Sequence, residues 1–153
     1  MAEAARKLKV DSRVADLLNR ALKLEGFFPE FKEEHVEKIF LRSGLYFYPK
    51  GAVVVEESAQ GRDLYVIERG NLAVNRKDGN VSRCVANLKE GDIFGEIGLL
   101  HGGVRIATVI AQEDSKVFHI AYADIQYLLK HNQNLGMHLD NLAKERLLKP
   151  GRS

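Results

Sequence analysis

Between residues 45 and 120 the chain is divided into short apolar segments, and this pattern constrains the fold more than any other feature. Seven segments rich in Val, Ile, Tyr and Phe are separated by glycine-containing breaks: 45–48, 52–57, 63–69, 71–76, 81–88, 104–111 and 115–120. The Asp78-Gly79 pair between two of them is a typical hairpin turn. Segments this short and this closely spaced predict an antiparallel roll or barrel, because parallel strands need much longer connections.

The regions on both sides of these segments have helical periodicity. Asp11 or Ser12 can cap a first helix, which is expected to end near Gly26, and a second helix is expected to end near Gly44. Residues 1–10 are expected to be frayed. After Ile120 the pattern predicts two further helices, the first of which ends near residues 131–132.

The predicted fold class is therefore α+β, with an antiparallel, jelly-roll-like β-roll flanked by N-terminal helices and two C-terminal helices. A length of 153 residues fits one domain. We assign all of it to a single domain, divided into helices at 11–44, the β-roll at 45–120 and helices at 121–148.

A glycine-rich stretch at residues 94–109, FGEIGLLHGGVRIATV, interrupts the β-roll. Glycines beside a short helical turn let backbone N–H groups approach a ligand, and clustered N–H groups favour anions. Arg105 adds a planar, permanently charged group that suits a phosphate. Glu96 would repel a phosphate, so it is better suited to accept hydrogen bonds from sugar hydroxyls. The stretch predicts a pocket for the phosphate and ribose of a nucleotide.

With FGEIGLL and RIATV placed in this order of elements, the chain resembles the cyclic nucleotide-binding domain family over roughly residues 14–148. The resemblance implies that Glu96 accepts a hydrogen bond from the ribose 2′-hydroxyl and that Arg105 pairs with the cyclic phosphate. It implies further contacts from the backbone of the phosphate-binding stretch, at Gly95, Ile97, Gly98, Ile106 and Ala107. It also implies that Cys84 or Val85, on the strand at 81–88, packs against the base.

Arg146 lies on the apolar stripe of the last predicted helix, 41 residues after Arg105. An arginine there can extend its stem to reach water at the helix end, or it can meet a ligand or an acid across a pocket. The local sequence Ala-Lys-Glu-Arg, residues 143–146, resembles the lid of cyclic nucleotide-gated and hyperpolarisation-activated channel domains, where an arginine covers the purine. The resemblance therefore favours a lid role for Arg146.

Two positions depart from the family pattern. Val104 replaces the proline that often precedes the phosphate-binding arginine, and Ile106 replaces the small residue usual after it. Family members that select cGMP often carry a hydroxyl at the second position, which isoleucine lacks. The resemblance therefore implies cAMP as the ligand in preference to cGMP, with no other cofactor.

The implied function is that of a sensor domain and not an enzyme. Ligand binding would move the C-terminal helix and regulate an effector, expected to be an ion channel, linked covalently or non-covalently to the domain. One alternative is the sensory domain of a catabolite-activator-type transcription regulator, although a helix-turn-helix would have to follow the last helix. A kinase regulatory subunit and a ligand-free structural interaction domain are further alternatives.

Composition and residue spacing argue against several other classes of function. The formal net charge of +2 is too small to indicate nucleic-acid binding through bulk charge, and no apolar run reaches membrane-spanning length. The single cysteine, Cys84, excludes an internal disulfide and favours the cytoplasm, including the cytosolic face of a membrane protein. The five histidines lack paired metal-ligand spacing, so no metal site is expected.

Overall fold

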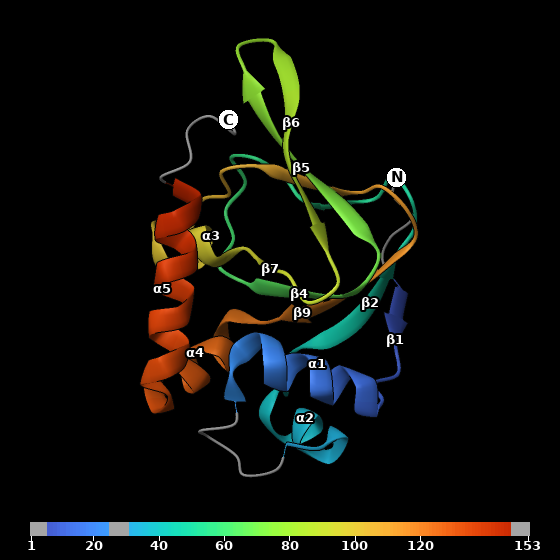
Figure 1. Ribbon diagram of the computed structural model, residues 1–153, viewed down its shortest axis with the longest axis vertical. Coiled ribbons are helices and arrows are strands. Elements are labelled where there is room, and N and C mark those ends of the chain that lie inside the picture. Colours follow the sequence, from blue (N-terminus) through green and yellow to red (C-terminus); the bar gives the residue numbers. More distant parts are fainter. Residues whose placement is uncertain (1–5, 25–30, 148–153) are drawn as a thin grey trace.

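In the computed structural model, which describes residues 6–24 and 31–147, two antiparallel sheets are flanked by helices (Figure 1). The first sheet has five strands in the order β1 (Arg6–Leu8), β2 (Gly44–Tyr48), β9 (Ser115–Ile120), β4 (Leu64–Arg69) and β7 (Ile93–Phe94). The second has four, in the order β3 (Val53–Val55), β8 (Thr108–Ala111), β5 (Asn71–Asp78) and β6 (Val81–Lys89). The predicted β-roll with flanking helices is confirmed.

The strand β4 of the five-stranded sheet is buried on both faces. Leu64 and Val66 belong to a core formed with the helices, whereas Tyr65 and Ile67 belong to a second core shared with the four-stranded sheet. Side chains alternate between the two faces of a strand, so burial of both faces requires a continuous apolar run. The sequence Leu-Tyr-Val-Ile of β4 meets this requirement.

The N-terminal helices are α1 (Ser12–Leu22) and α2 (Glu33–Ile39). In Figure 1, α1 lies against the five-stranded sheet on the face away from the four-stranded sheet, and α2 packs against α1. Asp11 is the N-cap of α1, as predicted, and its carboxylate accepts hydrogen bonds from the amides of Arg13 and Val14. The predicted end near Gly26 lies outside the described residues, and α1 itself ends at Leu22. The second helix ends earlier than predicted, at Ile39. A turn closed by the hydrogen bond from the Ser43 amide to the Phe40 carbonyl oxygen then leads into β2.

The C-terminal helices are α4 (Tyr122–His131) and α5 (Gln133–Leu147), and they are separated by a single residue, Asn132. The Asn132 side-chain oxygen accepts a hydrogen bond from the Leu135 amide at 3.2 Å, which caps the new helix. After this break, α5 runs beside the short helix α3 (Glu96–Leu100), as Figure 1 shows. The capped break at Asn132 thus brings the end of the chain onto the glycine-rich stretch at residues 94–109.

The β5–β6 hairpin extends away from the helices in Figure 1, and its Asp78-Gly79 turn confirms the sequence prediction. Gly79 adopts a φ of +68°, which suits this type of turn. The pairing of the two strands shifts between Val74 and Asn75, which face Ala86 and Cys84 respectively. Val85 is therefore the extra residue of a β-bulge.

Two strands were not predicted. β1 falls within residues expected to be frayed, but it pairs with β2 from Arg6 to Leu8. β7 is only two residues long and follows the turn at Gly91-Asp92. Strands of two or three residues are too short to show a recognisable alternation.

Candidate functional site

A cavity of about 400 Å³ lies between the four-stranded sheet, α3 and the C-terminal part of α5. Its size falls within the range of small-molecule sites. It brings together nine of the ten residues predicted from the sequence: Val85, Gly95, Glu96, Ile97, Gly98, Arg105, Ile106, Ala107 and Arg146. The remaining residue, Cys84, does not line the cavity.

The guanidinium of Arg105 sits in a cradle of three glycines. A Cβ atom added to Gly61, Gly95 or Gly98 would lie 2.8 Å, 3.0 Å or 3.1 Å from a nitrogen of that guanidinium. Gly95 also has a φ of +95°, a conformation that side chains rarely adopt. At Gly61 the missing side chain makes room for the arginine alone. At Gly95 and Gly98 it also avoids the nearer carbonyl oxygens of Asp63 and Gly61, which would lie 2.7 Å and 2.8 Å from an added Cβ.

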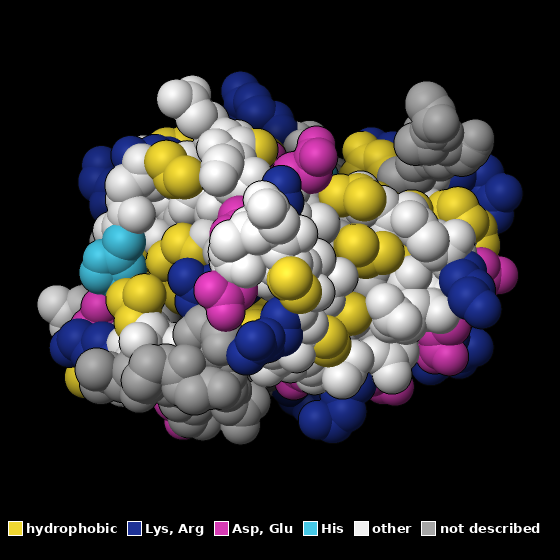
Figure 2. Space-filling view, turned by 90° about the horizontal axis from the view of Figure 1, so that it is seen from above, with side chains coloured by type: hydrophobic (Ala, Val, Ile, Leu, Met, Phe, Trp, Pro, Cys, Tyr) yellow, Lys and Arg dark blue, Asp and Glu magenta, His cyan; other side chains and the backbone are white. Residues whose placement is uncertain are grey.

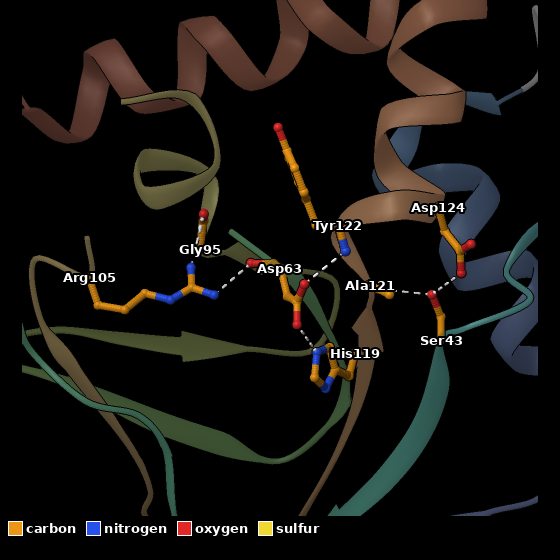
Figure 3. A network of polar contacts seen from close by, with 8 residues as sticks. All are labelled: Ser43, Asp63, Gly95, Arg105, His119, Ala121, Tyr122 and Asp124. Atoms are coloured by element: carbon orange, nitrogen blue, oxygen red, sulfur yellow. Dashed lines mark hydrogen bonds and ion pairs between the residues drawn. The ribbon is translucent and has the colours of Figure 1, made fainter. Parts of the chain in front are cut away.

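Two backbone carbonyls orient Arg105. Its Nη2 donates to the Asp63 carbonyl oxygen at 2.9 Å and its Nη1 donates to the Gly95 carbonyl oxygen at 3.3 Å (Figure 3). The guanidinium carbon also lies 5.6 Å from the centre of the Tyr65 ring, in a cation–π contact. These two hydrogen bonds use two of the five N–H donors of the guanidinium, so donors remain for another acceptor.

Arg105 is only 6% exposed, yet within the described ranges 6–24 and 31–147 no carboxylate forms an ion pair with it. Burial raises the pKa of the adjacent Tyr65, an effect that Arg105 partly offsets, so this tyrosine stays protonated near neutral pH. Tyr65 therefore supplies no negative charge. A buried cation without a counter-ion is costly. The site thus favours an anionic ligand.

Glu96 is the first residue of α3 and is 2% exposed. Its Oε1 accepts a hydrogen bond from Nη1 of Arg146 at 2.7 Å, which forms an ion pair between α3 and α5. Of the two interpretations of Arg146, the structure therefore shows the side chain contacting an acid at the cavity and not extending to water alone. This contact places the end of α5 at the cavity.

The prediction that Cys84 can pack against the base requires a correction. It is exposed, and its Sγ contacts the Ala86 carbonyl oxygen at 3.5 Å, whereas Val85 lines the cavity. The bulge at Val85 interrupts the regular alternation of side chains along β6. A pattern of apolar residues cannot show where such an interruption falls. The sequence therefore could not show which of Cys84 and Val85 faces the cavity.

The cavity also contains polar side chains that sequence reasoning missed. Arg76 lies on β5, two residues after the cavity-lining Val74, and Asn87 lies on β6, two residues after Val85. Glu145 precedes Arg146 on α5. The spacing of two along β5 was a usable signal, because residues two apart on a strand share a face.

Among the described residues on the face seen from the hairpin end, charged side chains form no extended patch of one sign. Figure 2 shows Lys and Arg side chains interspersed with Asp, Glu and apolar side chains. In the described part of the chain, no cluster of three or more His, Cys, Asp or Glu residues could hold a metal ion. No helix among those same residues is both long and apolar enough to cross a bilayer.

Residues 46–132 match the family model described as the cyclic nucleotide-binding domain. The matched segment is more than half of the chain and contains the whole glycine-rich stretch at residues 94–109. The chain belongs to the cyclic nucleotide-binding domain family. Domains of this family are regulatory rather than catalytic, and the predicted family is confirmed.

Two curated relatives and one solved structure illustrate the similarity. The cAMP-dependent protein kinase regulatory subunit of Aspergillus fumigatus is 37% identical over 82 residues, which is 54% of this chain and 19% of that protein. The cAMP-activated global transcriptional regulator CRP of Pasteurella multocida is 29% identical over 105 residues, which is 67% of this chain and 50% of that protein. The catabolite activator protein of Thermus thermophilus superposes with a TM-score of 0.70 at 26% identity, covering 86% of this chain and 60% of the other.

This chain matches about a fifth of the length of one curated relative and half of the length of the other. One is named as a kinase regulatory subunit and the other as a transcription regulator. The narrower likeness to channel domains finds no support among them.

Proposed function

We propose that this domain binds a cyclic nucleotide, cAMP in preference to cGMP, in the cavity between the four-stranded sheet, α3 and α5. The observation that carries the proposal is the buried guanidinium of Arg105, which lines the cavity without a carboxylate partner in the described ranges. A cyclic phosphate would neutralise that charge and accept hydrogen bonds from the donors that the carbonyls leave free.

Glu96 is the proposed acceptor for the ribose hydroxyl. Arg146 contacts its Oε1, and a carboxylate has acceptor sites on both oxygens. The carboxylate can therefore bind Arg146 and a hydroxyl at the same time. In this arrangement Arg146 and Leu142 of α5 cover the nucleotide, and Val74 and Val85 supply apolar contacts for the base.

The backbone of the phosphate-binding stretch contributes further donors to the proposed site. Glu96, Ile97 and Gly98 form the first turn of α3, where backbone N–H groups have no acceptor within the helix. Ile106 and Ala107 follow Arg105 along the cavity wall. We propose that the amides of Gly98, Ile106 and Ala107 bind the phosphate with Arg105.

The preference for cAMP rests on two arguments. Ile106 offers no hydroxyl to the amino group of guanine, and the names of both curated relatives described above contain cAMP. The same names support a kinase regulatory subunit or a transcription regulator as the effector-bearing protein, in preference to the ion channel that the sequence suggested. We propose one domain over residues 1–153, acting in the cytoplasm.

Regulation would follow from a population shift. A nucleotide that contacts both Glu96 on α3 and Arg146 on α5 binds more tightly when these helices are together. It can shift the equilibrium only by that difference in affinity. The change in the position of α5 would then act on the attached effector.

Isothermal titration calorimetry with cAMP and cGMP tests the proposal. The wild type should bind cAMP more tightly than cGMP, and Arg105→Ala should weaken cAMP binding by at least about tenfold. Arg105→Lys should give an intermediate loss, because an ammonium group lacks the planar arrangement of donors. The matched control is Arg83→Ala, which removes an exposed arginine paired with Asp78 on the hairpin.

Absence of binding to the wild type, or equal binding by Arg105→Ala and Arg83→Ala, would exclude the proposed function. The first result would favour a domain that keeps the fold for protein interaction alone. A circular dichroism melt of each variant separates loss of binding from loss of folding.

A further inference from the structure

Asp63 connects the phosphate-binding arginine to the start of α4. Its backbone carbonyl oxygen accepts the hydrogen bond from Arg105 at 2.9 Å. Its carboxylate accepts a hydrogen bond from the Tyr122 amide at 2.8 Å, and its other oxygen lies 2.6 Å from Nε2 of His119 (Figure 3). One residue thus contacts groups that are 42, 56 and 59 positions away in the sequence.

The helix α4 depends on these contacts for its N-terminal cap. Its N-cap residue is Ala121, which has no side chain able to accept a hydrogen bond from the first turn. Asp63 and Ser43 supply acceptors from outside the helix, because Ser43 Oγ accepts a hydrogen bond from the Ala121 amide at 2.9 Å. Ser43 in turn donates to Asp124 at 2.7 Å. Two separate anchors therefore hold the same end of α4.

The two anchors differ in what else they contact. Asp63 also accepts from Arg105, whereas the hydroxyl group of Ser43 contacts Ala121 and Asp124 (Figure 3). The Asp63 carboxylate has a partner on each oxygen, one on β9 and one on α4. These contacts restrict the orientation of its backbone carbonyl. Movement of the Arg105 guanidinium therefore displaces the peptide group of Asp63. The Asp63 carboxylate in turn passes this displacement to the first turn of α4.

We propose that Asp63 is a positioning residue that transmits occupation of the phosphate site to α4 and, through α4, to α5. This inference rests on the proposed function and extends it to a named route within this chain. An anionic ligand that binds Arg105 would fix the guanidinium, and with it the Asp63 carbonyl. The carboxylate would then hold the N-terminus of α4 in one position, where its negative charge also suits the helix dipole.

Hydrogen–deuterium exchange of the full chain, with and without saturating cAMP, tests this route. In the wild type, cAMP should slow exchange both in residues 95–107 and at the amides of α4. In Asp63→Ala, residues 95–107 should still be protected by cAMP, but the slowing at α4 should fall by about tenfold. Asp63→Asn keeps an acceptor for the Tyr122 amide and should restore most of the slowing at α4.

Ser43→Ala is the matched control, because it removes the other anchor of α4. It should raise exchange at α4 in both conditions while leaving the additional slowing by cAMP intact. Full slowing at α4 in Asp63→Ala, or equal loss of slowing in Ser43→Ala, would overturn the inference. Absence of any effect of cAMP on residues 95–107 of the wild type would instead contradict the proposed function.

Discussion

Nη1 of Arg146 lies 2.7 Å from Oε1 of Glu96, so a residue of α5 pairs with a residue of α3 that precedes it by 50 positions. The two partners differ in exposure, because the Glu96 side chain is 2% exposed and that of Arg146 is 29% exposed. The carboxylate is therefore the group that depends on the pair. Its loss of water is compensated by an arginine that remains partly hydrated.

Arg146→Ala should lower both stability and ligand affinity. Breaking a fully buried pair costs about 3–5 kcal/mol, but water can reach this arginine, so we expect the free energy of unfolding to fall by about 1–2 kcal/mol. Affinity for cAMP should fall less than in Arg105→Ala, because Arg146 does not bind the phosphate. Urea denaturation and calorimetric titration measure the two effects.

The control for this prediction is Lys144→Ala on the same helix. It removes an exposed pair with Asp140 and should change stability by no more than about 0.5 kcal/mol. If Arg146→Ala weakens cAMP binding as much as Arg105→Ala does, the lid assignment is wrong.

Some residues of the site could be predicted from the sequence and others could not. Glu96 and Arg105 were found because their chemistry lies within one short stretch with several glycines. Gly61 and Asp63 were missed, although both contact Arg105. Asp63 contacts it through a backbone carbonyl, and any residue type has one. Such a contact leaves no trace in residue identity.

The fold, like the site, could be predicted only in part. The β-roll could be predicted because each longer strand carries its own turn signal and apolar residues. The register of β6 could not, since the bulge at Val85 depends on pairing with β5 and not on the residues of β6 alone. This is why Cys84 and Val85 remained equivalent until the structure separated them.

The glycine cradle predicts that Gly61→Ala weakens cAMP binding. An added Cβ would lie 2.8 Å from Nε of Arg105, too close for the guanidinium to keep its position. Because the φ of Gly61 is not positive, the effect is one of space and not of backbone strain. We expect a loss of affinity of about tenfold, measured by calorimetric titration.

Gly136→Ala offers the matched control for the cradle. Its added Cβ would meet no atom closer than 3.8 Å, and alanine favours a helix by about 1 kcal/mol. This variant should melt at a higher temperature and bind cAMP as the wild type does. Unchanged binding by Gly61→Ala would show that Arg105 tolerates displacement.

Arg76 should influence the choice of base. It lines the cavity on β5 and faces Arg83 across the strand pair, an arrangement that is unfavourable for like charges. Arg83 has Asp78 as a partner, whereas no described residue pairs with Arg76. Arginine can donate two hydrogen bonds to O6 and N7 of guanine, but adenine presents an amino group in place of O6.

We therefore expect Arg76→Ala to weaken cGMP binding more than cAMP binding. A bidentate contact of this kind discriminates by about 1–3 kcal/mol, so the ratio of cAMP to cGMP affinity should rise by about tenfold. Competition titrations of both nucleotides measure this ratio, with Arg69→Ala, which removes an exposed arginine at the end of β4, as the control. An equal loss for the two nucleotides would show that Arg76 contributes only general positive charge.

We expect the folded protein to lose stability in mild acid because of His138. Burial lowers the pKa of this α5 histidine below its ordinary value of 6.5, and Lys23, at the end of α1, lowers it further against an opposing hydrogen bond to Ala21. The unfolded chain then binds more protons than the folded one. The stability that depends on neutral His138 is complete above pH 6.5 and is lost as the pH falls through the lowered pKa.

Urea denaturation at pH 8 and pH 5.5 should show this loss in the wild type. His138→Gln should lose less stability over the same interval, because glutamine stays neutral throughout. His101→Gln, on the exposed loop after α3, controls for removal of a histidine and should follow the wild type. If His138→Gln loses as much stability as the wild type, protonation of His138 does not oppose folding.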